Sequence, residues 1–275
     1  MYRFYIRHKK IIVFLPFLIF TYAFIYFINY LDLSGNPAII RQNTFMFFLI
    51  RSFSGFLTIE SFNMFEIILA TLLLLVPLFV FAGEFREDLK ISYPYVFTRY
   101  GKKVTWLRKR FLALSNKIIL FELVRLFIYS ILSLIVSKSF YIDLSSAIEF
   151  LKCFGLNVLH LLFWVSLENI LGVRLDDSIS IPIIMSIYIT LIIIIANVFS
   201  HIPTYLLYIL VPANVMYFWH TNINLPEYQA VLKPLDNFFI GYSFIALILL
   251  IIIMYLIFDY LLKKLDSMEL LGGNL

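Results

Sequence analysis

Long apolar runs make up most of this chain, and shorter segments that carry most of its charged residues separate them. A helix needs about 20 apolar residues to cross a hydrocarbon core roughly 30 Å thick. By that measure the pattern predicts about six membrane-spanning helices, at Ile11–Leu31, Phe65–Ala82, Ile118–Val136, Ala147–Leu171, Ile179–Ser200 and Phe238–Leu262. The expected fold is therefore an all-α, polytopic membrane protein, with residues 1–275 forming one transmembrane domain.

The composition supports lipid as the solvent of these runs. Hydrophobic residues make up 62% of the chain and charged residues only 14%, which is too apolar for a soluble domain that covers itself with polar surface. The formal net charge is +5, but the basic residues stand between apolar runs, where anionic lipid headgroups are the nearer partner. We expect membrane lipids, and no nucleic acid, as partners. The single cysteine, Cys153, excludes an intramolecular disulfide and a Cys-rich metal site.

The distribution of Lys and Arg predicts the orientation. Six crossings place both termini on one side of the membrane, together with the connections 83–117 and 172–178. Most of the 22 Lys and Arg residues belong to that side, and the other side holds only Arg41, Arg51, Lys138 and Lys233. Because basic segments remain on the cytoplasmic side, we expect both termini in the cytoplasm.

Two segments on the opposite side are more apolar than ordinary loops. The connection 201–237 contains a run of apolar residues that Pro203 and Pro212 interrupt, so it is too broken for a standard span. We expect a re-entrant or interfacial helical hairpin before the last span. The run Phe45–Ile50 is expected to lie in the outer interface or in a packed external loop.

The connection 83–117 has two unlike halves. The first half, around Pro94, offers a polar and aromatic surface that could receive another protein, formed by Glu84, Glu87, Asp88, Tyr93, Tyr95 and Arg99. In the second half, apolar residues recur at helical spacing at Val104, Leu107, Phe111 and Leu114. Basic residues fill the remaining faces, at Lys102, Lys103, Arg108, Lys109 and Arg110. This pattern predicts an amphipathic helix on the membrane surface; the alternative is a basic loop held on anionic lipid.

This layout resembles a known family. Six spans, a basic N-terminal segment, a long second-to-third connection and a broken apolar hairpin before the last span look like the ABC-2-type permease subunits of bacterial ABC transporters. More narrowly, they resemble short permeases linked with bacteriocin or lantibiotic immunity and peptide export. The matching motif is Gly83-Glu84, then Phe97-Thr98-Arg99-Tyr100-Gly101 and Trp106 with Lys109.

The resemblance implies a function and partners. In that family the second-to-third connection contains a coupling helix that docks into the nucleotide-binding subunit, so Glu84 to Arg99 would be the docking surface. Two permease protomers, identical or different, would enclose the substrate path in the bacterial cell membrane. ATP and Mg²⁺ would bind to an ATPase subunit dimer and not to this chain.

Ionisable groups inside the spans are candidates for function because they are costly in hydrocarbon. Glu122 and Arg125 lie three residues apart on one helical face, which predicts an ion pair. Glu168 is expected at a similar depth, where Arg125 could bridge two carboxylates and brace the helices. A lone His160 among Leu and Phe indicates packing rather than metal binding, and no metal site is expected. Lys152 and Asp259 can pair locally or reach the interface.

Several motifs are missing from the sequence. It has no GxxxxGK[ST] phosphate loop, no HExxH and no GxSxG, so we expect no catalysis by this chain and a separate ATPase subunit as the driver. The resulting hypothesis is a permease subunit that exports a hydrophobic or amphipathic substrate such as a peptide. The alternative is a non-transporting membrane scaffold or sensor that recruits a cytoplasmic partner through the basic connection.

The orientation is testable by cysteine labelling. A cysteine at position 233 should react with an impermeant thiol reagent in intact cells, and a cysteine at position 103 should not, because the basic connection lies inside. The reverse labelling pattern would contradict the orientation.

Overall fold

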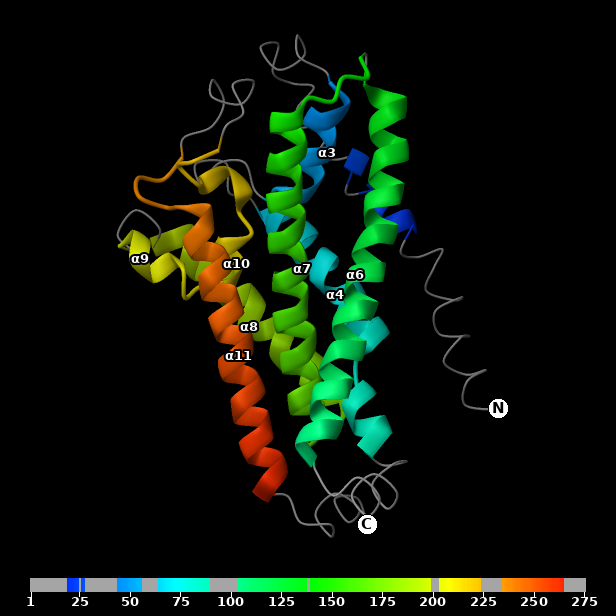
Figure 1. Ribbon diagram of the computed structural model, residues 1–275, viewed down its shortest axis with the longest axis vertical. Coiled ribbons are helices and arrows are strands. Elements are labelled where there is room, and N and C mark those ends of the chain that lie inside the picture. The colour runs from blue at the N-terminus through cyan, green and yellow to red at the C-terminus, as the bar shows by residue number, and fades with distance from the viewer. Residues whose placement is uncertain are drawn as a thin grey trace.

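The computed structural model describes residues 19–24, 26–27, 44–55, 64–89, 103–137, 139–198, 203–223 and 234–264. Every regular element within these residues is a helix. The long helices are α4 (Met64–Phe81), α6 (Lys103–Val136), α7 (Leu144–Gly172), α8 (Asp177–Val198) and α11 (Ile240–Lys264). They lie side by side along the long axis of the molecule (Figure 1). The predicted all-α fold is confirmed.

Four helices of the described part are long and apolar enough to cross a membrane, at Val104–Val136, Leu144–Gly172, Asp177–Ile195 and Ile240–Leu262. They coincide with the last four predicted spans. Large apolar side chains such as Leu120, Phe127 and Leu256 face outward from them, as lipid-facing residues do. The chain therefore has the architecture of a membrane-embedded, multi-pass protein.

The first two predicted spans are described less completely. The second forms the helix α4. Of the first, residues 19–24 and 26–27 are helical, and the remainder lies outside the described residues. Six crossings, and the cytoplasmic position of the termini, thus stay predictions.

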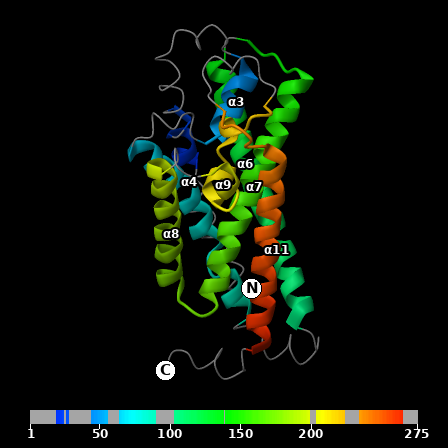
Figure 2. The same cartoon turned by 90° about the vertical axis from the view of Figure 1, so that its left-hand side faces the viewer.

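The helix α7 lies at the centre of the bundle and contacts α3, α4, α6, α8, α10 and α11. Successive long helices run in alternating directions (Figures 1 and 2). The turn after α4, the start of α6, the α7–α8 turn and the last part of α11 therefore share one end, where the Phe85 ring stacks on Phe258 with centroids 5.7 Å apart. We call it the basic end. The sequence predicts the same grouping of connections.

The helix α6 extends without a break over 34 residues, about 51 Å at 1.5 Å per residue. It therefore joins the predicted surface helix to the third span, and the expectation of a separate helix lying on the membrane surface is wrong. Neither Gly nor Pro occurs between Lys103 and Val136, so nothing interrupts the backbone hydrogen bonds. The apolar face packs on protein instead of lipid: Leu107 and Leu114 are fully buried, and the Phe111 ring contacts Tyr255.

The short helix α3 (Phe45–Phe53) enters the bundle from the end opposite the basic end (Figure 1). Its nine residues are all buried. The Phe45 amide donates to the Ser139 carbonyl at 3.1 Å, and at the other terminus the Asn157 side chain donates to the Phe53 carbonyl at 2.8 Å. The helix α3 therefore packs between α6 and α7, and its position relative to the membrane stays a prediction.

The apolar segment before α11 folds into short helical turns, namely α9 (Thr204–Leu207), α10 (Val211–Asn214) and the 3₁₀ helix η2 (Tyr217–Trp219). Pro203 precedes α9, and Pro212 stands at the start of α10, where proline is tolerated. The segment packs against α7, α8 and α11, and the Tyr217 amide donates to the Ser54 carbonyl at 2.9 Å. Its broken helical character agrees with the sequence, and its re-entry into the hydrocarbon stays a prediction.

Gly83 allows the close turn after α4. Its φ is +70°, and a Cβ at this position would lie 2.5 Å from a carboxylate oxygen of Asp177. We expect Gly83→Ala to lower the free energy of unfolding by roughly 1–3 kcal/mol, through left-handed backbone strain and this contact. Thermal unfolding of the purified protein measures the effect.

Gly241→Ala is the matched control. Gly241 lies in α11, and a Cβ there would meet nothing within 4 Å, so this variant should unfold at the wild-type temperature or above it. Equal melting temperatures for Gly83→Ala and the wild type would show that the turn is not constrained as described.

Candidate functional site

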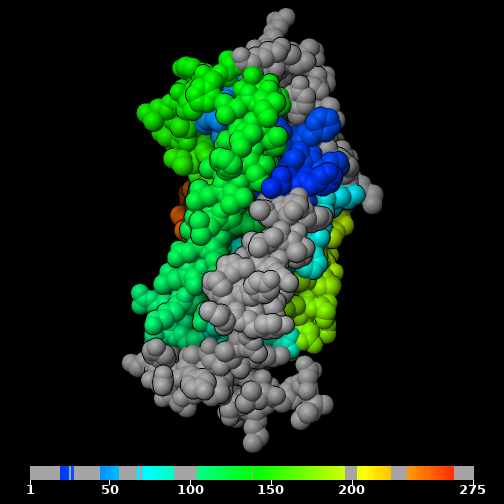
Figure 3. All heavy atoms as spheres, turned by 90° about the vertical axis from the view of Figure 1, so that its right-hand side faces the viewer, coloured from blue at the N-terminus to red at the C-terminus, as the bar shows by residue number. Residues whose placement is uncertain are grey.

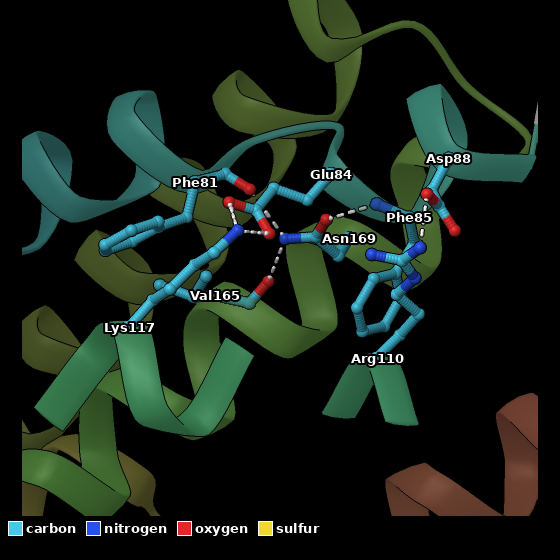
Figure 4. A network of polar contacts seen from close by, with 8 residues as sticks. All are labelled: Phe81, Glu84, Phe85, Asp88, Arg110, Lys117, Val165 and Asn169. Carbon is cyan, nitrogen blue, oxygen red and sulfur yellow. Dashed lines mark hydrogen bonds and ion pairs between the residues drawn. The ribbon is translucent and has the colours of Figure 1, made fainter. Parts of the chain in front are cut away.

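The turn after α4 is held by the side-chain amide of Asn169 on α7. Its Nδ2 donates to the Phe81 carbonyl at 2.9 Å and to the Val165 carbonyl at 2.9 Å, and its Oδ1 accepts from the Phe85 amide at 3.0 Å. Figure 4 shows Asn169 between the end of α4 and the helical turn 84–89. One fully buried side chain thus satisfies backbone groups on both sides of the turn.

Glu168, next to Asn169, joins the same turn to α8. Its carboxylate accepts from the Ser180 hydroxyl at 2.8 Å and from the Gly83 amide at 3.4 Å. The prediction that Arg125 bridges Glu122 and Glu168 is wrong. Arg125 contacts Asn157 on α7, and Glu168 lies eleven residues further along that helix, about 16 Å toward the basic end.

Ion pairs tie the helical turn 84–89 to its neighbours (Figure 4). The Lys117 ammonium lies 2.7 Å from the Glu84 carboxylate, and Arg110 lies 2.5 Å from Asp88. The Trp106 indole also donates to Asp88, at 2.7 Å. On the other side, Arg86 pairs with Asp176 in the α7–α8 turn. We call this set the turn network: Glu84, Arg86, Asp88, Trp106, Arg110, Lys117, Glu168, Asn169, Asp176 and Ser180.

Two of the predicted docking residues, Glu84 and Asp88, belong to the turn network. Glu84 and Asp88 are half-buried and pair with cations of α6, whereas Glu87 is exposed. Tyr93, Tyr95, Arg99 and Lys102 lie outside the described residues.

The predicted basic residues share the first turns of α6. Arg108 and Lys109 are exposed there, Arg110 is half-buried, and Lys103 is the first residue of the helix. The exposed charges at the described part of this end therefore include Glu87, Arg108 and Lys109.

A second polar cluster lies inside the bundle. Arg125 and Glu122 form the predicted ion pair, 2.8 Å apart, with side chains 3% and 0% exposed. The Arg125 guanidinium also donates to the side-chain amide oxygen of Asn157 at 3.1 Å and lies 4.1 Å from the centre of the Phe53 ring. We call Tyr22, Glu122, Arg125, Tyr129 and Asn157 the mid-bundle cluster. It joins α3, α6 and α7, as expected of a brace.

Two further ionisable residues of the spans, His160 and Lys152, have local partners. His160 accepts a hydrogen bond from the Trp164 indole at 3.0 Å and lies against the Tyr188 ring, in agreement with a packing role. Lys152 pairs with Glu149 at 2.8 Å. Within the described residues, no group of three or more His, Cys, Asp or Glu side chains could hold a metal ion.

Several residues of these two sites were not predicted from the sequence. Asn157 and Asn169 carry no charge, yet they bond to α3, α4 and α6. The sequence marks both residues as Asn within apolar runs. A side-chain amide in hydrocarbon finds no water, so it needs a hydrogen-bond partner within the protein. The pairing of Lys117 with Glu84 has no such signal, since 33 residues separate them.

The chain was compared with protein-family models, with curated proteins and with solved structures, and none of the three comparisons finds a match. The function is therefore argued from the sequence and the two polar sites.

Arg125 is expected to be essential for stability. Arg125→Leu leaves the Glu122 carboxylate buried without its counter-charge, which should cost about 3–5 kcal/mol. The amount of protein in the membrane and its thermal unfolding both report this loss. Glu168 should be unaffected, because Ser180 and Gly83 are its partners.

The double variant Glu122→Leu/Arg125→Leu supplies the control. Replacing both partners removes the uncompensated charge, so the double variant should recover much of the stability that the single variant loses. If Arg125→Leu unfolds at the wild-type temperature, the ion pair is not the brace described here.

Proposed function

We propose that this chain is the membrane-spanning permease subunit of an ABC-2-type transporter in a bacterial cell membrane. Two protomers, identical or paired with a sister permease, enclose the path of a hydrophobic or amphipathic substrate such as a bacteriocin or another exported peptide. A separate ATPase dimer, which holds ATP and Mg²⁺, drives the cycle. The observation that carries this proposal is the turn network, in which one short helical turn is tied to α6, α7 and the α7–α8 turn.

The turn network suits the transmission of force. A partner that displaces the turn 84–89 also displaces α6, because Glu84 and Asp88 pair with Lys117 and Arg110. It displaces α7 through Asn169 and reaches the α7–α8 turn through Arg86 and Asp176. Phe85, stacked on Phe258, links the turn to α11. Movement at one end of a packed bundle is converted in this way into rigid-body movement of its helices.

The partner would bind where the basic end is charged and exposed. Glu87 stands on the turn, and Arg108 and Lys109 stand on the first turns of α6. These charges would pair with complementary charges in a binding groove of the ATPase. The resemblance of the connection 83–101 to the coupling element of ABC-2 permeases favours the same surface.

A scaffold or sensor would use this exposed surface without any need for a turn bonded to several spans. The bonded turn favours the permease. The distinguishing measurement is the rate of ATP hydrolysis in a complex of this chain with the ATPase that copurifies with it. A rate that rises when the permease is present supports transport, and failure of any ATPase to copurify with the chain from its native membrane contradicts it.

Charge reversal at the turn tests the docking surface. Glu87→Lys should weaken binding of the ATPase by about tenfold and leave folding unchanged, because the side chain is exposed and surface substitutions usually change stability by less than about 0.5 kcal/mol. Copurification and ATP hydrolysis measure the binding, and thermal unfolding measures the stability. Normal transport by Glu87→Lys, with a normal rate of hydrolysis, would contradict docking at this residue.

The pair Glu84 and Lys117 provides a matched test of coupling. Glu84→Lys breaks the bond to α6, whereas Glu84→Lys/Lys117→Glu exchanges the charges and restores it. We expect the single variant to hydrolyse ATP with less transport per ATP, and the exchanged variant to regain coupling. Equal coupling in both variants would show that Glu84 meets the partner directly and does not transmit force to α6.

A further inference from the structure

Unpartnered polar atoms gather between α6 and the helical residues 19–24 and 26–27, which we call the first helix. Within the described residues, the buried side-chain atoms that lack a hydrogen bond include the Tyr22 and Tyr129 hydroxyls, both Glu122 oxygens and Arg125 Nε. The contact of Glu122 with Arg125 is an ion pair that leaves the hydrogen-bonding capacity of both groups incompletely used. Buried polar groups of folded proteins are nearly always bonded, so this concentration calls for an explanation.

These atoms belong to one small region. Glu122, Arg125 and Tyr129 are spaced at i, i+3 and i+7 on α6, which places them on one face. The Tyr22 ring contacts the Tyr129 ring edge to face, with centroids 5.7 Å apart, and Tyr22 interacts electrostatically with Glu122 and Arg125. Aromatic rings enclose the group: Phe53 lies under the Arg125 guanidinium, and Phe121 contacts Tyr22.

In the next turn of these two helices, toward the end opposite the basic end, the hydroxyls are bonded to each other. Tyr26 and Ser133 continue the same two faces, four residues beyond Tyr22 and Tyr129, and there the Tyr26 hydroxyl donates to Ser133 at 3.1 Å. The interface of the first helix with α6 thus contains one bonded hydroxyl pair beside a cluster whose hydroxyls remain unused.

The first helix covers this cluster from the lipid side. Tyr22 and Tyr26 are buried against α6, whereas Phe20 and Phe27 are 69% and 55% exposed. Figure 3 shows the segment 19–27 on the outside of the bundle, beside α6. A molecule dissolved in the membrane would meet the cluster as soon as these two helices part.

The chemistry of the cluster selects a class of ligand. One carboxylate and one guanidinium cancel in charge, so an ionic ligand would leave an uncompensated charge in low dielectric. The Glu122 oxygens accept hydrogen bonds, whereas Arg125 Nε–H and the hydroxyls of Tyr22 and Tyr129 donate them. Aromatic rings surround these groups. A neutral amide group with apolar side chains satisfies all of these features.

We propose that the mid-bundle cluster is a binding site for the backbone amide of an apolar peptide. The peptide N–H donates to the Glu122 carboxylate, and its carbonyl accepts from Arg125 Nε or a tyrosine hydroxyl. This inference rests on the proposed function and deepens it, because it names the group of the exported peptide that the permease recognises. Phe53 and Phe121 contact its apolar side chains.

Binding to the purified permease, without any ATPase, tests the site. The probe is tritiated acetyl-Leu-Phe-Leu-amide, measured by equilibrium binding to protein in lipid nanodiscs. We expect Tyr22→Phe/Tyr129→Phe to bind it at least tenfold more weakly, the effect of one or two buried hydrogen bonds. The same variant should unfold at the wild-type temperature or above it, because the deleted hydroxyls have no partner in the folded protein.

Tyr26→Phe is the matched control. It removes a hydroxyl that is bonded to Ser133, so its melting temperature should fall while its affinity for the tripeptide stays at the wild-type value. A depsipeptide probe, with an ester oxygen in place of the central N–H, should bind wild type about tenfold more weakly because it cannot donate to Glu122.

Three outcomes would overturn the proposal: no binding of the tripeptide by wild type, equal affinity of wild type and Tyr22→Phe/Tyr129→Phe, or equal affinity for the amide and the ester. The assay contains no ATPase, so its failure is distinct from that of the proposed function, which is judged by the hydrolysis rate in the complex.

Discussion

The arrangement of this bundle depends on the polar side chains of α7, which must find partners where lipid offers none. A backbone or side-chain polar group left unbonded in hydrocarbon costs several kcal/mol. Along α7, Glu149 accepts from Tyr217, Asn157 bonds to α3 and α6, Glu168 accepts from α8, and Asn169 bonds to the turn after α4. Each partner belongs to a different element, so α7 fixes the positions of its neighbours around itself.

Different groups satisfy the polar atoms at the two ends of the bundle. At the basic end, ion pairs and the Asn169 amide bind the turn 84–89 into a unit with α6, α7 and the α7–α8 turn. Gly83 makes this possible, because its φ of +70° is strained for a residue with a side chain. At the opposite end, α3 and the short helices α9, α10 and η2 fill the space between the spans with short pieces whose termini bond to one another. One end is thus held by charged and amide side chains, and the other by short helical segments packed against the spans.

The mid-bundle cluster stands between these ends and contains several buried polar atoms without hydrogen-bond partners. Asn157 uses its amide fully, with bonds to Phe53, Cys153 and Arg125, whereas Tyr22 and Tyr129 beside it have hydroxyls without partners. Native proteins depart from local rules chiefly at functional sites. The contrast between the bonded Asn157 and the unbonded hydroxyls beside it is the basis of the proposed binding site.

The sequence by itself determined the all-helical, membrane-embedded class, the last four spans and the grouping of connections at the basic end. The length of an apolar run is a local property of the sequence, and it can be compared directly with the thickness of the hydrocarbon core. It also predicted the Glu122–Arg125 pair, since residues three positions apart on one helix share a face.

Only the tertiary structure decided the rest, for reasons that are not local. Residue spacing shows that Val104, Leu107, Phe111 and Leu114 share a stripe, but α11 and the turn 84–89, not lipid, cover most of it. The depth of Glu168 relative to Arg125 depends on the antiparallel register of α6 and α7, which no single segment encodes. Likewise, Glu84 meets Lys117 across 33 residues of chain, and α3 is buried because α6 and α7 leave space for it. Such pairings depend on how the helices pack together.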